Sequence, residues 1–384
     1  MTDRHVVVAG AGVAGLETAL ALQALAEGLV SVELVAPETE FTYRPLAVAE
    51  PFRVGEMRRF PLERLVHAAG AELRRGALRS VDADGNTVTL EDGAMLAYDA
   101  LVLALGARPR AVVPGALTFG GSKEDQEAMA DLLERASAGE VHRIAFVLPR
   151  EATWPLPLYE LALLTSEYLV SHMTRHVELV LVTPEERPLA LFGPAASDAI
   201  SQLLELRGIR HTSNAQVEAD AIVALPALEG LPLDGIPQDE RGFVATDEFG
   251  WVLGLTDVYA VGDLTQFPIK QGGIATQQAD AVASSIAADA GARVRPTTFE
   301  PVLRGLLLTG MSPRFLRTSR GAHPSLVDTQ PLWWPPAKIV GRYLTPFLAE
   351  HLGLSRESVR PPGIDAVPVD VTIEAGNRSA WSSV

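Results

Sequence analysis

Three glycines near the start of the chain have the spacing of a phosphate-binding loop. Gly10, Gly12 and Gly15 form a G-x-G-x-x-G pattern between the apolar run 5–9 and the helix-forming run 16–26. In such a loop the first glycine permits a tight turn, the second lets the backbone approach a pyrophosphate, and the third lets helix and strand pack closely. The helix amides and dipole then face the phosphates. This context predicts a dinucleotide site, whereas the alternative is a glycine-rich turn that binds nothing.

A second group of chemically capable residues lies late in the chain. Gly262 and Asp263 end the short apolar run 257–261, and Gly272 and Gly273 precede an alanine-rich stretch over 274–290. An aspartate at such a position can accept hydrogen bonds from sugar or polyol hydroxyls. Bare backbone at a helix start offers free amides and a positive dipole end. Gly-Asp alone is a weak signal, but it becomes strong beside the N-terminal glycines and the Ala-Leu-Gly strand end at 104–106.

Two features between these groups leave alternatives open. After the second expected strand, 29–35, the usual place of a ribose-binding acid falls on Ala36. Glu38 could reach the ribose instead, or it could be a solvated loop acid. The stretch 41–46, which includes Arg44 and Pro45, could pack beside a ring system or form a turn with an aromatic anchor.

The surrounding pattern predicts elements that position these loops. We expect a helix over 63–69, a hairpin of strands 78–81 and 87–90, and a buried parallel strand that ends near 105. Beyond 361 the pattern is weak, with one expected strand over 366–373.

A second strand–helix–strand–helix series follows, at 144–148, 159–170, 177–182 and 195–207. Its spacing echoes the first unit and suggests an internal duplication of the nucleotide fold. The loop 149–157, however, carries prolines and a tryptophan where the glycines should be. Prolines remove backbone donors and fix the chain. We therefore expect that this unit does not bind NAD(P) in the usual way.

Composition narrows the classes of function. The chain has 384 residues, a net charge of −16, eight scattered histidines and no cysteine. The negative charge argues against nucleic acid and against broad adhesion to anionic lipid, and the missing cysteine excludes disulfides and thiolate metal sites. We expect no bound metal. The first strand begins within five residues and no apolar run reaches the length of a membrane span, so we expect a cytoplasmic protein.

The stretch 301–342 differs from the rest of this acidic chain. It contains one acid, Asp328, the apolar run 332–336, and six cations: Arg304, Arg314, Arg317, Arg320, Lys338 and Arg342. It could be a membrane-interface or quinone-access segment. We favour an arm that packs on the core, with its arginines facing solvent.

Taken together, residues 6–15, 41–46, 103–109 and 256–278 resemble the superfamily of FAD-dependent pyridine nucleotide–disulfide oxidoreductases. Within it, the likeness is to the branch of sulfide:quinone oxidoreductase, flavocytochrome c sulfide dehydrogenase and type II NADH dehydrogenase. The resemblance covers roughly residues 4 to 295.

The resemblance implies that FAD, rather than NAD, occupies the N-terminal loop. Asp263 would bind the ribityl or nearby phosphate region, Arg44 and Pro45 would lie by the isoalloxazine, and Lys270 would favour the anionic reduced flavin. The amides at 272–274 would face the flavin pyrimidine. The full set of expected cofactor-binding residues is Gly10, Ala11, Gly12, Val13, Ala14, Gly15, Glu38, Arg44, Pro45, Val81, Ala104, Gly106, Gly262, Asp263, Lys270, Gly272, Gly273 and Ile274.

The sequence also departs from that branch. Sulfide-oxidising relatives use cysteines, and in the second-domain loop Thr153 and Trp154 stand instead. The glycine fingerprint that NADH dehydrogenases carry in the second domain is lost. The customary sites of both electron donors are therefore missing. No general base is predicted; Glu160 is a speculation, and an exposed helical glutamate is the favoured interpretation.

The expected fold is α/β, with two Rossmann-like dinucleotide-binding domains and a C-terminal arm. The FAD domain would be discontinuous, over 1–110 and 247–300, with a degenerate second domain over 111–246 inserted and the arm over 301–384. The leading function is an FAD-dependent oxidoreductase that passes electrons from an unidentified donor to a quinone or other small acceptor. The alternatives are an NAD(P)H-dependent reductase with atypical nicotinamide binding and a non-catalytic FAD-binding subunit or sensor. Peripheral membrane contact is not favoured, and the sequence does not set the oligomeric state.

Overall fold

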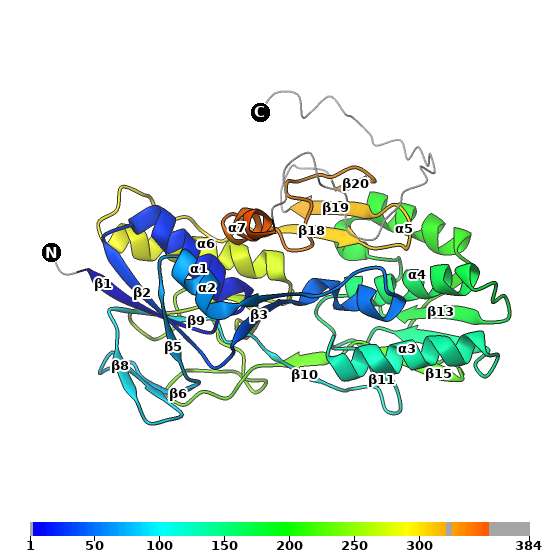
Figure 1. Cartoon of the computed structure of the whole chain (residues 1–384), viewed down its shortest axis with the longest axis horizontal. Coiled ribbons are helices and arrows are strands. Elements are labelled where there is room, and N and C mark those ends of the chain that lie inside the picture. The colour runs from blue at the N-terminus through cyan, green and yellow to red at the C-terminus, as the bar shows by residue number, and fades with distance from the viewer. Residues whose placement is uncertain (1–2, 320–324, 353–384) are drawn as a thin grey trace.

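The structure is a computed structural model that describes residues 3–319 and 325–352. Two parallel β-sheets lie toward the two ends of the molecule, and a smaller antiparallel sheet lies along one side between them (Figure 1). This arrangement confirms the predicted α/β class with two Rossmann-like units. The strand predicted over 366–373 and the cation Arg320 lie outside the described residues.

The first sheet is built from four strands of the N-terminal region and one from much later in the chain. Its order is β17-β9-β1-β2-β5, and all neighbours run parallel. Its strands are β1 (Arg4–Ala9), β2 (Val30–Ala36), β5 (Glu72–Arg75), β9 (Ala100–Leu103) and β17 (Val258–Ala260). Its helices are α1 (Val13–Ala26), α2 (Leu62–Ala68) and α6 (Gly272–Asp289). The near-continuous apolar sequences of β1 and β9 follow from burial on both faces.

The second sheet repeats this plan with its own strands and helices. Its order is β11-β15-β12-β13-β14, again all parallel. Its strands are β11 (Leu117–Thr118), β12 (Arg143–Val147), β13 (Glu178–Thr183), β14 (Ile209–Ser213) and β15 (Ala221–Ala224). Its helices are α3 (Lys123–Ser137), α4 (Leu156–Ser171) and α5 (Pro194–Leu206). The predicted second strand–helix series is therefore confirmed, whereas the sequence pattern does not reveal the edge strands β11 and β14 or the inner strand β15.

Small antiparallel pairs connect and flank the two sheets. The predicted hairpin is confirmed as β6 (Leu78–Asp82) with β7 (Thr87–Leu90), and a third strand extends it. The remaining strands are β3 (Glu40–Tyr43), β4 (Arg58–Pro61), β8 (Met95–Ala97), β10 (Arg108–Arg110) and β16 (Ala227–Glu229). The 3₁₀-helices are η1 (Arg44–Phe52), η2 (Ala190–Phe192) and η3 (Gly262–Leu264).

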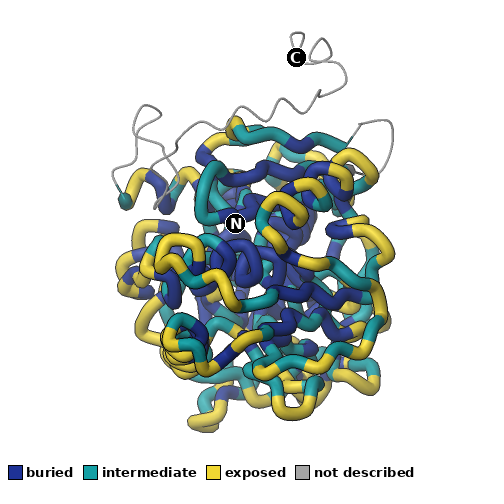
Figure 2. Tube along the Cα trace, turned by 90° about the vertical axis from the view of Figure 1, so that its right-hand side faces the viewer, coloured by how far each residue is buried: buried dark blue, intermediate teal, exposed yellow. Residues whose placement is uncertain are grey.

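The topology explains why distant loops meet. β1, β9 and β17 are neighbouring parallel strands, so their carboxyl ends lie along one edge of the sheet. The strand ends are tied together by backbone hydrogen bonds from Ala104 N–H to Ala9 O, at 2.8 Å, and from Val261 N–H to Leu103 O, at 3.0 Å. In open α/β sheets this edge is where ligands bind. Small side chains, among them Ala14 and Ala275, lie in the apolar core where α1 packs against α6. Figure 2 shows buried chain inside and exposed chain in the outer turns.

The C-terminal arm is a packed part of the fold over its described residues. Its strands β18 (Val302–Leu307), β19 (Arg314–Ser319) and β20 (Leu326–Asp328) form an antiparallel sheet, and α7 (Leu344–His351) follows. Leu303, Leu307 and Leu316 join the apolar core that α4 also enters. The expectation that the arginines face water is wrong for Arg314, which is 8% exposed and donates to Ser312 O at 2.8 Å.

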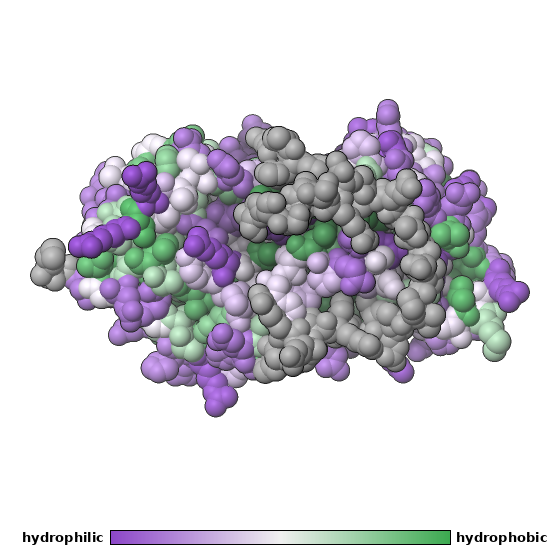
Figure 3. Space-filling model, turned by 90° about the horizontal axis from the view of Figure 1, so that it is seen from above, coloured by the Kyte–Doolittle hydropathy of each residue, from purple (hydrophilic) through white to green (hydrophobic). Residues whose placement is uncertain are grey.

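The face that carries the arm shows apolar surface near the middle of the molecule (Figure 3). Among the helices of the described residues, none is both long and apolar enough to cross a membrane.

Candidate functional site

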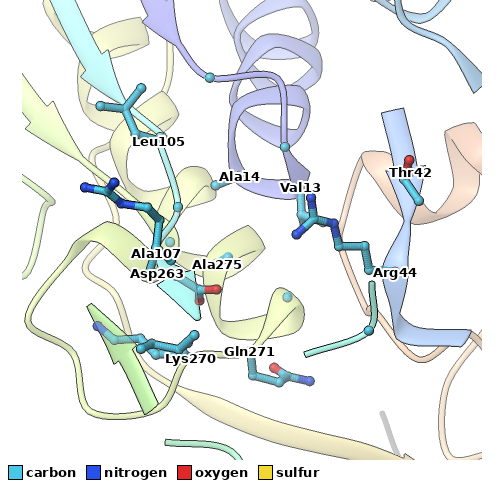
Figure 4. Close-up of a pocket in the computed structure, with 18 of the residues that line it drawn as sticks. Val13, Ala14, Thr42, Arg44, Leu105, Ala107, Asp263, Lys270, Gln271 and Ala275 are labelled. Carbon is cyan, nitrogen blue, oxygen red and sulfur yellow. The ribbon is translucent and has the colours of Figure 1, made fainter. Parts of the chain in front are cut away.

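A cavity of about 920 Å³ opens at the carboxyl edge of the first sheet. It begins at the glycine loop after β1, passes the ends of β9 and β17, and continues to the loop 152–157 and the arm. Of the residues predicted from sequence to hold a cofactor, fourteen line this cavity: Gly10, Ala11, Gly12, Val13, Ala14, Glu38, Arg44, Pro45, Ala104, Gly106, Gly262, Asp263, Lys270 and Gly272. Figure 4 shows part of this lining. One continuous space therefore joins motifs that are far apart in sequence.

Each of the three glycines of the loop meets a different structural requirement. Gly10 has a φ of +110°, and a Cβ there would lie 2.3 Å from Ala104 O. A Cβ on Gly15 would lie 1.9 Å from Gly10 O, so Gly15 serves close packing and does not line the cavity. Gly12 alone faces open space, with nothing within 4 Å of a Cβ. A ligand can therefore approach the protein backbone most closely at Gly12.

The start of α1 leaves backbone donors for such a ligand. Gly12 is the N-cap residue and supplies no side-chain cap, so the amides of the first turn lack the usual side-chain acceptor. The first turn also lacks an acidic side chain. Free amides and the positive end of the helix dipole together make an anion site. The cradle fits the pyrophosphate of a dinucleotide.

Asp263 and Lys270 lie on one side of the cavity, opposite Arg44 (Figure 4). Gly262 N–H donates to Gln278 Oε1 of α6 at 2.8 Å, and this bond fixes the turn that carries Asp263. Burial raises the pKa of Asp263, and the nearby Lys270 partly opposes that effect.

Lys270 is buried and held in place by two contacts. It is 6% exposed, it donates to Thr265 O, and its Nζ lies 4.1 Å from the centre of the Phe243 ring. Burial lowers the pKa of Lys270 to about 8, although the charge of Asp263 acts in the opposite direction. The site therefore holds a cation that can lose its proton just above neutral pH.

The start of α6 differs from the prediction at two residues, Gly273 and Ile274. Gln271 is the N-cap, and its Oε1 accepts a hydrogen bond from Ile274 N–H at 2.9 Å. Ile274 is buried in the core, so it offers no free amide to the cavity. Gly272 does line the cavity and Gly273 does not. A Cβ on Gly272 would lie 2.8 Å from the side chain of Ile339. The arm therefore lies directly on this helix start.

The structure also locates the other residues predicted to bind the cofactor. Val81 is buried in the core and does not line the cavity. Glu38 lines the cavity from a solvent-exposed loop, and its carbonyl accepts from Arg75, so its role as a ribose ligand stays a prediction. Arg44 and Pro45 begin η1, and the guanidinium of Arg44 points toward the side of the cavity where Val13 lies (Figure 4).

Glu160 and Lys338 form a buried ion pair that the sequence did not predict. Lys338 Nζ lies 2.6 and 2.7 Å from the two carboxylate oxygens, and Leu308 N–H donates to Oε1 at 2.9 Å. The side chains are 1% and 8% exposed, and both residues line the cavity. The interpretation of Glu160 as an exposed helical residue is therefore wrong. Burial raises the pKa of Glu160, while the charge of Lys338 opposes this.

The second sheet presents a different loop at the matching edge. Trp154 lines the cavity and packs edge-on against Phe192, with ring centres 5.9 Å apart. At the end of β13, where a dinucleotide fold places its ribose-binding acid, Glu185 instead accepts a hydrogen bond from Tyr159 at 2.8 Å. At this edge of the second sheet, Trp154 and Glu185 therefore contact neighbouring side chains of the chain itself.

Comparisons with known proteins agree with this geometry. Residues 4–147 match the model of the pyridine nucleotide-disulphide oxidoreductase family. The sulfide-quinone reductase of Aquifex aeolicus is 32% identical over 127 residues, which are 33% of this chain but only 27% of that protein. The ferredoxin reductase component of chlorobenzene dioxygenase from a Cupriavidus species is 28% identical over 319 residues, covering 73% of this chain and 74% of that protein.

A solved structure extends the likeness along the chain. The sulfide:quinone oxidoreductase of Aquifex aeolicus superposes with a TM-score of 0.73 over 85% of this chain and 86% of that one, at 20% identity. At that identity the superposition establishes the shared fold. With its glycine cradle, its duplicated parallel sheets and the match over residues 4–147, the chain is similar to the FAD-dependent pyridine nucleotide-disulphide oxidoreductases.

Proposed function

We propose that the chain passes electrons through a bound FAD from a donor to a quinone or another small acceptor. The observation that carries this proposal is the continuity of the cavity. Gly12 at one end and Trp154, Leu306 and the Glu160–Lys338 pair at the other line the same space. When bound, FAD supplies the redox step, and the protein supplies position and electrostatics.

The far end of the cavity supports an acceptor with an apolar body and a polar oxygen. Leu156, Leu306 and Ile339 provide apolar walls, and the Trp154 ring lies beside them. Lys338 provides hydrogen-bond donors that Glu160 holds in place from the opposite side. A quinone combines an apolar ring with carbonyl oxygens that accept such hydrogen bonds. In this proposal Lys338 binds the acceptor and Glu160 orients Lys338.

The same proposal divides the chain by role. Residues 1–110 and 247–300 form the FAD domain, 111–246 form the degenerate second domain, and 301–384 form the arm. The cofactor site consists of the lining residues from the first domain, with Asp263 and Lys270 at its centre. The second domain contributes Trp154 and Leu156 to the far end of the cavity, where the acceptor would bind.

An anaerobic screen of possible reductants tests the proposed function. The FAD-loaded protein is mixed with NADH, NADPH, sulfide or a short-chain quinol, and the long-wavelength flavin absorbance is followed. We expect the quinol to bleach the flavin, because quinone reduction is reversible, and the nicotinamides to leave it oxidised. Bleaching by NADH within seconds would instead favour an NAD(P)H-dependent reductase with an unusual nicotinamide pose. No reduction by any reductant, with stable co-purification of another protein, would favour a non-catalytic subunit.

Replacing Lys270 with methionine is expected to make the reduction potential of bound FAD more negative by about 30–60 mV, or about 1.4–2.8 kcal/mol for a two-electron couple. The physical reason is that a nearby cation favours the anionic reduced flavin. Because burial lowers the pKa of Lys270 to about 8, its effect should fade as the pH rises through that value. Dye-equilibration potentiometry across this range measures both effects.

The control for this variant removes a similar cation elsewhere. Lys123 lies on α3 with its side chain 76% exposed, and Lys123→Met should leave the potential unchanged. Equal potentials for Lys270→Met and the unaltered protein would contradict the assigned role of Lys270.

A further inference from the structure

The arm segment 338–344 forms part of the cavity wall and is held by a few specific contacts. Its residues Lys338 and Ile339 line the cavity. Ile339 N–H donates to the buried Tyr43 hydroxyl at 2.9 Å, and Val340 O accepts from Thr276 at 3.1 Å. At the other end, the segment runs into α7. The position of Lys338 against Glu160 therefore depends on how this segment is anchored.

The strongest anchor is Glu17, a fully buried carboxylate in the middle of α1. Its Oε1 accepts a hydrogen bond from Tyr343 N–H at 2.9 Å, and its Oε2 accepts one from Leu344 N–H at 2.6 Å. These two amides belong to the start of α7, which has no other side-chain cap. A Cβ on Gly341 would lie 2.6 Å from Glu17 Oε2, so the segment fits closely around the carboxylate. Glu17 thus joins α1 to the arm.

A second carboxyl group lies beside the first. Asp280 of α6 is hydrogen-bonded to the Glu17 carboxyl, which requires a proton between them. The other oxygen of Asp280, Oδ1, is buried without a hydrogen-bond partner. The charged and titratable groups that act on the pair from the arm are Arg342 and Tyr343. From α1 and α6, the pair itself supplies the titratable groups. Two carboxyl groups in such a place share one proton more readily than they ionise together.

We propose that Glu17 and Asp280 form a proton-dependent latch that positions the arm segment 338–344 against the cavity. With one proton in the pair, Asp280 donates to Glu17, and the ionised Glu17 holds both amides of α7. When the proton is lost, two neighbouring buried carboxylates repel each other and the segment loosens. Glu17 and Asp280 are positioning residues, since they act on the cavity only through Lys338 and Ile339. The latch does not depend on which donor or acceptor the protein uses.

The direction of the pH effect follows from burial. Burial and the charge of Glu17 raise the pKa of Asp280 to about 8, well above its ordinary value of 3.8. A carboxyl group whose pKa is raised on folding stabilises the folded form at low pH, and that contribution is lost as the pH rises through the folded value. The segment should therefore be held more tightly at acidic than at neutral pH, loosen further up to about pH 8, and change little above that value.

Amide hydrogen exchange on the full chain tests the latch without any activity assay. Peptides that cover 338–344 are followed by mass spectrometry between about pH 6 and pH 10, and rates are divided by the intrinsic exchange rates. We expect protection to fall by up to about tenfold per pH unit between about pH 6 and pH 8 and to level off above about pH 8, because the pair keeps its proton in the closed form and loses it on opening. Asp280→Asn should keep its protection at high pH, since the asparagine amide donates to Glu17 permanently.

Two further variants separate a latch from general destabilisation. Glu17→Gln should lower protection of 338–344 at every pH, because its amide places a donor against one of the two N–H groups. Glu27→Gln removes a charge from the exposed end of the same helix and should behave like the unaltered protein. Protection that does not fall between about pH 6 and pH 8, or a fall that persists in Asp280→Asn, would overturn the proposal.

Discussion

Replacing Gly12 with leucine is expected to abolish FAD binding and leave the protein folded. Gly12 has φ −78° and ψ −166°, a backbone conformation that any residue adopts, and nothing lies within 4 Å of a Cβ there. The leucine side chain would therefore occupy the space where the pyrophosphate must approach. We expect the affinity for FAD to fall at least about 100-fold, or about 3 kcal/mol. Fluorescence titration of the apoprotein with FAD measures the loss.

Stability measurements on the same variant distinguish a blocked cradle from an unfolded chain. Leucine is a poor N-cap, so the unliganded protein should lose only about 1 kcal/mol of unfolding free energy. Ala24→Leu adds similar bulk to an exposed position on the same helix and should bind FAD normally. Gly15→Ala should instead disrupt folding, because its Cβ would lie 1.9 Å from Gly10 O. Full FAD affinity in a folded Gly12→Leu protein would show that the cofactor does not lie at this loop.

Breaking the Glu160–Lys338 pair is expected to produce the largest loss of stability among single substitutions in the arm. Lys338→Met leaves the fully buried Glu160 carboxylate with only the Leu308 N–H as partner. Removal of one member of a buried ion pair typically costs about 3–5 kcal/mol, because the remaining charge stays desolvated. Urea unfolding at neutral pH measures the loss. Glu160→Gln should have an effect of the same order, since it leaves Lys338 without its counter-charge.

The double substitution provides the decisive comparison. Glu160→Gln with Lys338→Met removes both charges, and we expect it to recover most of the stability that either single change loses. The exposed pair of Lys123 and Glu127 on α3 is the matched control, and Lys123→Met should leave stability nearly unchanged. Additive losses in the Glu160 and Lys338 variants would mean that the two side chains do not act as a pair.

The first sheet could be read from sequence because its signals are local. A buried strand, a glycine turn and a helix lie next to one another over residues 5–26, and the periodicity of the second unit repeats the same signal. The short strands β10, β11 and β16 have two or three residues and are set by pairing with distant partners. Such elements leave no pattern within their own residues.

The site was predicted best where one motif contains its own geometry. The glycine loop and Asp263 line the cavity as their spacing suggested, whereas Glu160 and Lys338 meet across 178 positions in sequence. A lysine beside prolines in an irregular segment carries no signal of its own partner. The sequence predicts a free amide at Ile274, because residue types do not show that Gln271 caps it. Side-chain caps depend on rotamers, and residue types alone do not determine rotamers.

The cofactor content of the purified protein tests the central claim most directly. The claim is that the first glycine cradle holds FAD and that the matching edge of the second sheet, where Trp154 lies and Tyr159 donates to Glu185, holds no nucleotide. Apoprotein is equilibrated with FAD and NADH together, freed of excess ligand by gel filtration, and its bound nucleotides are released and identified by mass spectrometry. We predict an equimolar amount of FAD and no retained NADH, with the FAD lost in Gly12→Leu. Retained NADH, or a protein that binds no FAD, would contradict the account.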